Sequence, residues 1–131
     1  MNSVTKICFS VLLASSLMVP TFVNATVAAD MRTMQESYVS ASKSEDIATL
    51  KAALTTFRDS VTRAKTQVPP DFANQPADGP DRKAYVEGLD KLLEKVDSAL
   101  TLANEGKLKE AKASLSDIVL LRNEYHKKMR G

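Results

Sequence analysis

The chain has 131 residues and carries 18 Lys and Arg against 16 Asp and Glu, with one cysteine and one histidine. This length allows one domain at most. The near balance of charge gives no support for a nucleic-acid-binding protein.

Residues 1–25 have the pattern of a cleavable signal peptide. Lys6 supplies the positive charge before an apolar run over 7–19, which is too short to span a membrane. Pro20 follows this run, and 23–25 offers small residues for cleavage. We expect a cut after Ala25, export of the chain, and no membrane anchor in the mature chain.

The expected mature chain, 26–131, is therefore a single domain without cysteine. Cys8 leaves with the signal peptide, and Lys6 is the only charge lost, so 17 Lys and Arg remain against 16 Asp and Glu. An exported chain without cysteine cannot be a disulfide scaffold, an iron–sulfur protein or a thiol enzyme. The fold must be held by its core, or by its core and a ligand.

Two helices are predicted in the first half of the domain. We expect the first over 26–43, where apolar residues recur every three or four positions: Val27, Met31, Met34, Tyr38 and Ala41. Ser44 and the acids after it resemble a helix start, so we expect the second helix over 45–67. Its inward stripe is Ile47, Leu50, Leu54, Phe57, Val61, Ala64 and Val68.

The second half of the domain starts with a proline-rich loop over 69–80. Pro80 suits the first turn of a third helix, which Gly106 should end. The inward stripe of this helix is Tyr85, Leu89, Leu92, Val96, Ala99 and Ala103. A fourth helix is expected from Leu108, with a stripe of Leu108, Ala111, Leu115, Ile118, Arg122, Tyr125 and Met129.

These patterns predict an all-α fold, an antiparallel up-down-up-down four-helix bundle. The links near 44 and 106 are short, so the helices they join must be antiparallel neighbours. We see no strand pattern and no glycine-rich phosphate loop. No paired carboxylates or nucleophile–base pair occupy an inward stripe, so we do not expect an enzyme.

In this topology the start of the first helix lies beside the end of the fourth. Met31 and His126 both fall on inward faces there, and a thioether and an imidazole can be the axial ligands of haem iron. Met34 lies one turn deeper in the bundle than Met31 and is the alternative thioether ligand. Each residue also has a plainer interpretation, because methionine is a common core filler and a histidine at the core edge can bond water or a carbonyl.

At this point the whole mature segment resembles the soluble cytochrome b562 family. The stretches that carry the resemblance are Leu54-Thr55 with Arg58, Pro69-Pro70, Pro80, Leu102-Ala103-Asn104-Glu105-Gly106-Lys107, and Arg122-Asn123-Glu124-Tyr125-His126. The resemblance implies that Met31 and His126 are the axial ligands of a haem.

The same resemblance implies a set of residues around the haem. It puts Tyr85 and Leu89 among the pocket residues, although Leu89 replaces the phenylalanine expected there. Phe57 stands where the family has a pocket methionine. Arg122 and Arg130 would lie near the haem edge and its propionates, with surface charge as the alternative interpretation of Arg130.

Without cysteine, the haem must be b-type and non-covalent, and we expect one per chain. Two protein ligands leave no open coordination position, which favours electron transfer over oxygen or peroxidase chemistry. We expect a monomer that exchanges electrons with a protein partner the sequence does not specify. The alternative function is a haem-free helical bundle that acts as a binding or chaperone-like protein.

Overall fold

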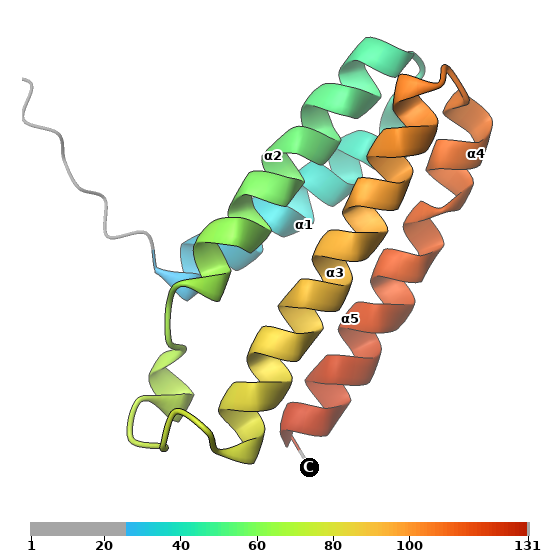
Figure 1. The fold of residues 1–131 in the computed structure, drawn as a ribbon. Helices are drawn as coiled ribbons and strands as arrows, with labels where there is room; N and C mark the ends of the chain where they lie inside the picture. The colour runs from blue at the N-terminus through green and yellow to red at the C-terminus, as the bar shows by residue number, and fades with distance from the viewer. Residues whose placement is uncertain (1–25, 131) are drawn as a thin grey trace, which may run out of the picture.

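The computed structural model describes residues 26–130, and residues 1–25 and 131 lie outside the described part. The expected signal peptide and its cleavage site fall in that part of the chain. The elements are α1 (Val27–Lys43), α2 (Ile47–Lys65), the 3-10 turn η1 (Pro70–Phe72), α3 (Pro80–Asn104), α4 (Leu108–Ala113) and α5 (Leu115–Arg130). Figure 1 shows α4 and α5 running together as the fourth column beside α3.

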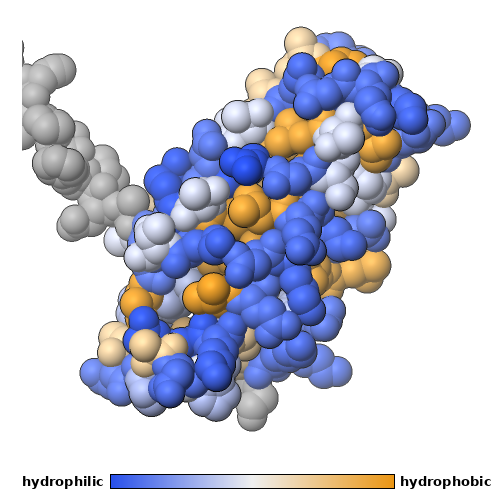
Figure 2. Space-filling view, in the orientation of Figure 1, coloured by the Kyte–Doolittle hydropathy of each residue, from blue (hydrophilic) through white to orange (hydrophobic). Residues whose placement is uncertain are grey.

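The predicted up-down-up-down four-helix bundle is confirmed. The helix α1 packs against α2, α2 packs against α3, and α3 packs against both α4 and α5. Each of these helices is amphipathic, and its buried side chains meet those of the next helix in a single core. On the face shown in Figure 2, hydrophilic residues cover most of the surface, and hydrophobic residues emerge between them.

Side-chain caps fix the starts of the first two helices. The Thr26 hydroxyl accepts a hydrogen bond from the Ala29 N–H at 3.1 Å, and the Asp46 carboxylate accepts one from the Thr49 N–H at 2.7 Å. The predicted cap at Ser44 was wrong. Its own N–H donates to the Ala41 carbonyl, so Ser44 ends α1 and α2 begins only at Ile47.

The link between α2 and α3 is longer than predicted. The helix α2 ends at Lys65, so Val68 is not on its inward stripe and is 42 % exposed. Pro80 opens α3 as expected. Gly106 lies just after the end of α3, at φ +78°, a conformation that glycine adopts without a steric penalty.

The predicted fourth helix is not continuous, because it is divided into α4 and α5. The Ser114 hydroxyl donates to the Ala111 carbonyl at 2.6 Å, and the Ser116 hydroxyl donates to the Ala113 carbonyl at 3.1 Å. The Asp117 N–H bonds the Ser114 carbonyl, only three residues back. Serine hydroxyls that bond nearby carbonyls compete with the helical pattern, and here they separate α4 from α5.

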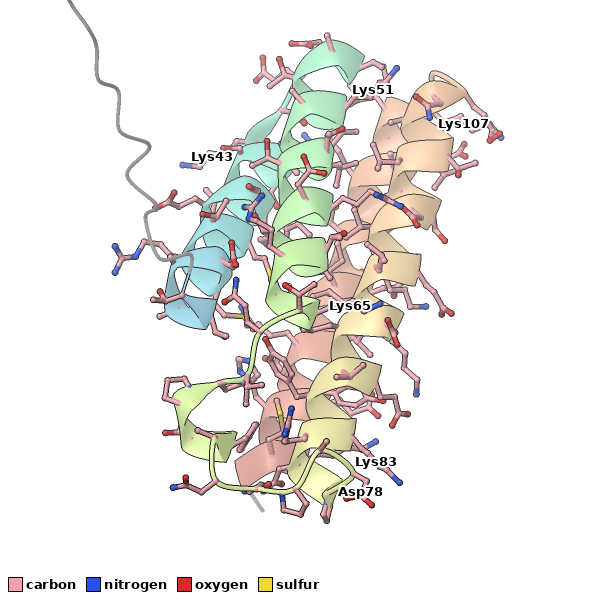
Figure 3. The ribbon with its side chains drawn as sticks, turned by 60° about the vertical axis from the view of Figure 1, so that its left-hand side comes forward. Lys43, Lys51, Lys65, Asp78, Lys83 and Lys107 are labelled. Atoms are coloured by element: carbon pink, nitrogen blue, oxygen red, sulfur yellow. The ribbon has the colours of Figure 1, made fainter. Side chains whose placement is uncertain are left out.

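The two ends of the bundle differ in their connections. The hairpin end is the end that holds the link 44–46 and the turn 105–107. The loop end, opposite, holds the start of α1, residues 66–79, the start of α3 and the end of α5. In Figure 3, Lys51 and Lys107 mark the hairpin end, while Asp78 and Lys83 mark the loop end.

Candidate functional site

A cavity of ≈ 370 Å³ opens within the half of the bundle toward the loop end. Its volume lies in the range of roughly 300–1,000 Å³ that is usual for cofactor sites. Four helices supply its walls: Met31, Met34, Gln35 and Tyr38 from α1; Phe57 from α2; Tyr85, Gly88, Leu89 and Leu92 from α3; and Ile118, Val119, Leu121, Arg122, Asn123, Tyr125, His126 and Met129 from α5.

The cavity brings together the two residues proposed as axial ligands. Met31 is partly buried on α1, and His126, an exposed residue of α5, also lines the cavity. The sequence predicted an inward-facing imidazole, but His126 is not buried in the core. Met34 also lines the cavity and is only 5 % exposed, so it remains the competing thioether.

The partial exposure of Met31 follows from how α1 sits on its neighbour. The buried face of α1 consists of Asp30, Met34, Ser37 and Ala41. Met34 and Ala41 were predicted there, whereas Val27, Met31 and Tyr38 of the predicted stripe are only partly buried. That face packs against α2. Because successive residues are about 100° apart, Met31 and Tyr38 turn away from α2 toward the cavity.

The predicted pocket residues also meet at this cavity. Phe57, Tyr85 and Leu89 are buried, with 4 %, 5 % and 5 % of their surface exposed. The Tyr85 hydroxyl donates to the Ala64 carbonyl at 2.6 Å, which fixes the ring against α2. Burial, and then the nearby charge of Asp30, raise the pKa of Tyr85 to about 12, so the hydroxyl stays protonated.

The two predicted arginines have different positions. Arg122 was expected on the inward stripe, but it is exposed, and Leu121 takes the buried position against α3. The Arg122 side chain reaches across to α1, where Nη1 donates to Gln35 Oε1 at 3.4 Å. Arg130 is the last residue of α5, and its side chain lies outside the described part of the structure.

The sequence did not predict the contacts that hold Tyr125, the residue before His126. The preceding ring, Tyr125, is 3 % exposed and lies against Gly88, where an added Cβ would be 2.9 Å from the ring. The Tyr125 hydroxyl donates to Glu87 Oε1 at 2.9 Å, and Lys128 Nζ is 4.5 Å from the ring centroid. The sequence feature that could have indicated these contacts is Gly88, because a glycine inside a helical pattern often marks close packing.

This cluster also changes the acidity of Glu87. The hydrogen bond from Tyr125, followed by the contact with Lys91, lowers the pKa of the Glu87 carboxyl. Lys91 Nζ is 3.2 Å from Glu87 Oε1. The hydroxyl of Tyr125 is therefore held by an ionised carboxylate at neutral pH, which fixes the ring that precedes His126.

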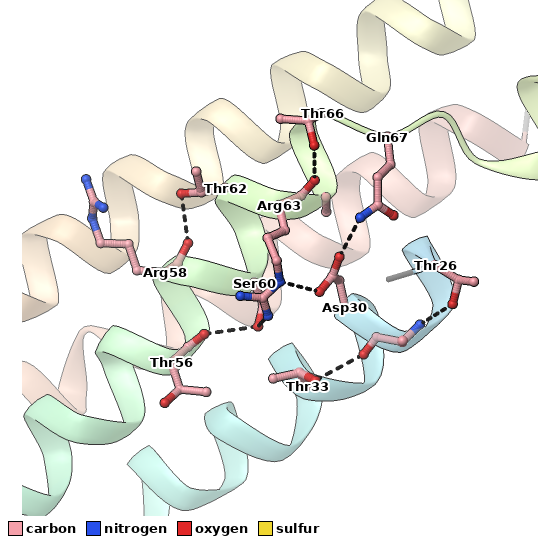
Figure 4. A network of polar contacts seen from close by, with 12 residues as sticks. Thr26, Asp30, Thr33, Thr56, Arg58, Ser60, Thr62, Arg63, Thr66 and Gln67 are labelled. Atoms are coloured by element: carbon pink, nitrogen blue, oxygen red, sulfur yellow. Dashed lines mark hydrogen bonds and ion pairs between the residues drawn. The ribbon is translucent and has the colours of Figure 1, made fainter. Parts of the chain in front are cut away.

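A second cluster that the sequence did not predict surrounds Asp30. This carboxylate is 3 % exposed and accepts hydrogen bonds from Arg63 Nε at 3.0 Å and from Gln67 Nε2 at 2.9 Å (Figure 4). The available signal was its spacing, because Asp30 is four residues from Met34 and seven from Ser37 on one helix face. The predicted stripe of this helix contained only apolar residues and tyrosine, so it left Asp30 out.

Comparison with known proteins identifies the family. The cytochrome b562 model matches residues 26–130, which is nearly all of the chain after the expected signal peptide. The chain belongs to the cytochrome b562 family. It is 38 % identical over 106 residues to probable soluble cytochrome b562 2 of Yersinia pestis, covering 81 % of this chain and 83 % of that protein.

A second relative from the same organism gives the same result. Probable soluble cytochrome b562 1 of Yersinia pestis is 30 % identical over 106 residues, covering 81 % of this chain and 84 % of the relative. The resemblance seen in the sequence is thereby confirmed. Membership of the cytochrome b562 family supports a b-type haem as the cofactor.

The residues that line the cavity suit such a group. It is walled mainly by apolar and aromatic side chains, which suit a flat macrocycle, and it presents thioethers and one imidazole. Within residues 26–130, no group of three or more His, Cys, Asp or Glu could hold a metal ion in another way. None of the described helices is long and apolar enough to cross a bilayer.

Proposed function

We propose that this cytochrome b562 family member is a periplasmic electron carrier that binds one non-covalent haem through Met31 and His126. The observation that carries the proposal is the shared cavity, which is lined by a thioether from α1 and an imidazole from α5. The only cysteine of the chain, Cys8, is in the expected signal peptide, so no thioether linkage to the haem is available.

When bound, the haem supplies a metal centre that accepts and releases one electron. Met31 and His126 would both bind the iron, which would leave no coordination position for a substrate. Phe57, Tyr85 and Leu89 would exclude water from the ring faces and stabilise it by contact. A neutral Tyr85 hydroxyl, bonded to a carbonyl, adds no charge to this environment. These features support an electron carrier rather than an enzyme.

Arg122 would serve the open side of the site. Its guanidinium borders the cavity and reaches Gln35 on α1. A planar guanidinium pairs well with carboxylates, so it suits the propionate edge of a haem. We propose the same role for Arg130 from its position at the end of α5.

The test is the optical spectrum of the haem-loaded protein and two methionine variants. A Soret band with a low-spin ferrous spectrum is expected for the wild type, and Met31→Ala should shift that spectrum towards high spin. Met34→Ala should keep the low-spin spectrum and cost stability, about 2–5 kcal/mol for a buried methionine. A spin change in Met34→Ala alone would assign the thioether to Met34. No Soret band in the wild type would leave the haem-free binding protein.

A further inference from the structure

A buried carboxylate directly precedes the proposed methionine ligand. Asp30 is 3 % exposed, and both of its oxygens are occupied: Oδ1 by Arg63 Nε and Oδ2 by Gln67 Nε2. Both partners come from the end of α2 and the residues just after it. The start of α1 is thus attached to α2 at two points (Figure 4).

The attachment continues into α2. Arg63 Nη2 donates to Ser60 Oγ at 3.1 Å, and the Ser60 hydroxyl donates to the Thr56 carbonyl at 3.0 Å. Ser60 is fully buried. The guanidinium is therefore oriented on both sides, and its orientation fixes that of the Asp30 carboxylate.

Burying a charged side chain to hold two helices together costs free energy. A buried charge costs free energy unless it is paired, and apolar side chains of similar volume often stabilise a fold as well. Two directed hydrogen bonds do something that apolar packing does not, because they fix the rotation of a helix about its axis. Residues 28 and 29 are exposed, and the start of this helix would otherwise fray.

We infer that Asp30 is the positioning residue for Met31, holding its sulfur where it can bind the haem iron in the ferric state. The inference rests on the proposed function, in which Met31 is an axial ligand. Methionine ligation favours the ferrous state, so the bond to ferric iron is the weaker one and depends more on position. Met31 follows Asp30 by about 100° of helix rotation, which turns it from α2 to the cavity.

The experiment uses imidazole as a competitor for the iron position held by Met31. Ferric haem-loaded wild type, Asp30→Asn and Met31→Ala are titrated with imidazole. We expect Asp30→Asn to bind imidazole about tenfold more tightly than the wild type, as for one lost hydrogen bond to a charged group. Met31→Ala should bind more tightly still. The ferrous spectrum of Asp30→Asn should remain low spin.

The matched control is Asp97→Asn. Asp97 also pairs with an arginine, Arg58, at 2.7 Å, but this pair joins α2 to α3, and neither residue lines the cavity. Its loss should leave the imidazole affinity unchanged. A milder variant, Gln67→Ala, keeps the Arg63 pair and should tighten imidazole binding about threefold, by analogy with a weaker hydrogen bond.

The outcomes separate the two claims. If Asp30→Asn and Gln67→Ala bind imidazole as the wild type does, or if Asp97→Asn matches Asp30→Asn, the positioning role of Asp30 is wrong. The proposed function survives that result. If the wild type already binds imidazole as tightly as Met31→Ala, Met31 is not a ligand, and both the proposed function and this inference are wrong.

Discussion

The two ends of this bundle use the same helices in different ways. At the hairpin end, small and aliphatic side chains such as Ala41, Leu50 and Ala99 are fully buried, and the links between helices are short. At the loop end, large side chains line a cavity between α1 and α5. The hairpin end is thus closed by short links, whereas the loop end holds the cavity.

The difference has a cause in the chain connections. At the hairpin end, Lys112 Nζ donates to the Ser44 carbonyl at 2.7 Å and ties α4 to the corner between α1 and α2. At the loop end, 14 residues separate α2 from α3, over 66–79, and the Arg122–Gln35 hydrogen bond links α5 to α1. We expect the loop end to gain more from a ligand than the hairpin end does.

The largest expected effect is the loss of that ligand-dependent gain in His126→Ala. A ligand that binds only the folded state stabilises it by about 4 kcal/mol at a thousandfold excess over Kd, or roughly 15–30 °C in Tm. Thermal melting with and without haem should show this increment in the wild type and little of it in the variant. Lys127→Ala, an exposed neighbour that does not line the cavity, should keep it. An unchanged increment in His126→Ala would contradict haem ligation by this residue.

A truncation at the hairpin end should act equally on both forms of the protein. Leu50 is fully buried, so Leu50→Ala should lower the free energy of unfolding by about 3 kcal/mol, with or without haem. Leu89→Ala is the comparison at the loop end. Leu89→Ala should lower the free energy of unfolding less in the haem-free protein than in the haem-loaded protein, because the cavity already borders that side chain. Urea unfolding of the two variants, each with and without haem, measures these changes. A haem-dependent cost for Leu50→Ala would show that the ends are not independent.

Alkaline pH should weaken the loop end through Tyr85. Its folded pKa of about 12 lies above the ordinary value of 10.0, so the unfolded chain releases this proton first. The contribution of Tyr85 to stability is therefore constant below pH 10 and falls between pH 10 and 12, by at most about 1.4 kcal/mol per pH unit. Urea unfolding at several pH values should show a smaller loss in Tyr85→Phe. Equal losses in both proteins would mean that the Tyr85 hydroxyl ionises freely in the fold.

The smallest effect concerns the contact that supports His126. In Gly88→Ala the new Cβ would be 2.9 Å from the Tyr125 ring, so the ring must shift, and overpacking of this kind costs about 1–3 kcal/mol. On helix propensity alone the change should instead stabilise α3 by about 1 kcal/mol. The sign of the change in unfolding free energy decides between the two. A stabilised variant would contradict the close packing of Tyr125 on Gly88.

The sequence predicted best where the buried face of a helix is entirely apolar. All six residues of the α3 stripe, from Tyr85 to Ala103, are buried as expected. The prediction was less accurate for α1, because this helix turns one face to α2 and another to the cavity. Apolar periodicity locates only apolar surface, so it placed Met31 and Tyr38 in the core and left out Asp30.

The predicted site residues came from the family resemblance as much as from the pattern. Met31, Phe57, Tyr85, Leu89, Arg122 and His126 all line one cavity, although their roles towards a haem remain predictions. The residues that hold them in place were not predicted. Gly88 has no side chain to follow, and the partners of Asp30 lie more than 30 residues away, so only the folded structure joins them.

Two of the four helices that line the cavity are the first and the last helix of the domain. Chain ends normally open and close independently of each other, at little cost in free energy. A ligand held by both Met31 and His126 would require both ends to be ordered at once, so opening either end would release it. About 95 residues of chain separate these two positions, yet their local opening would become a single cooperative event.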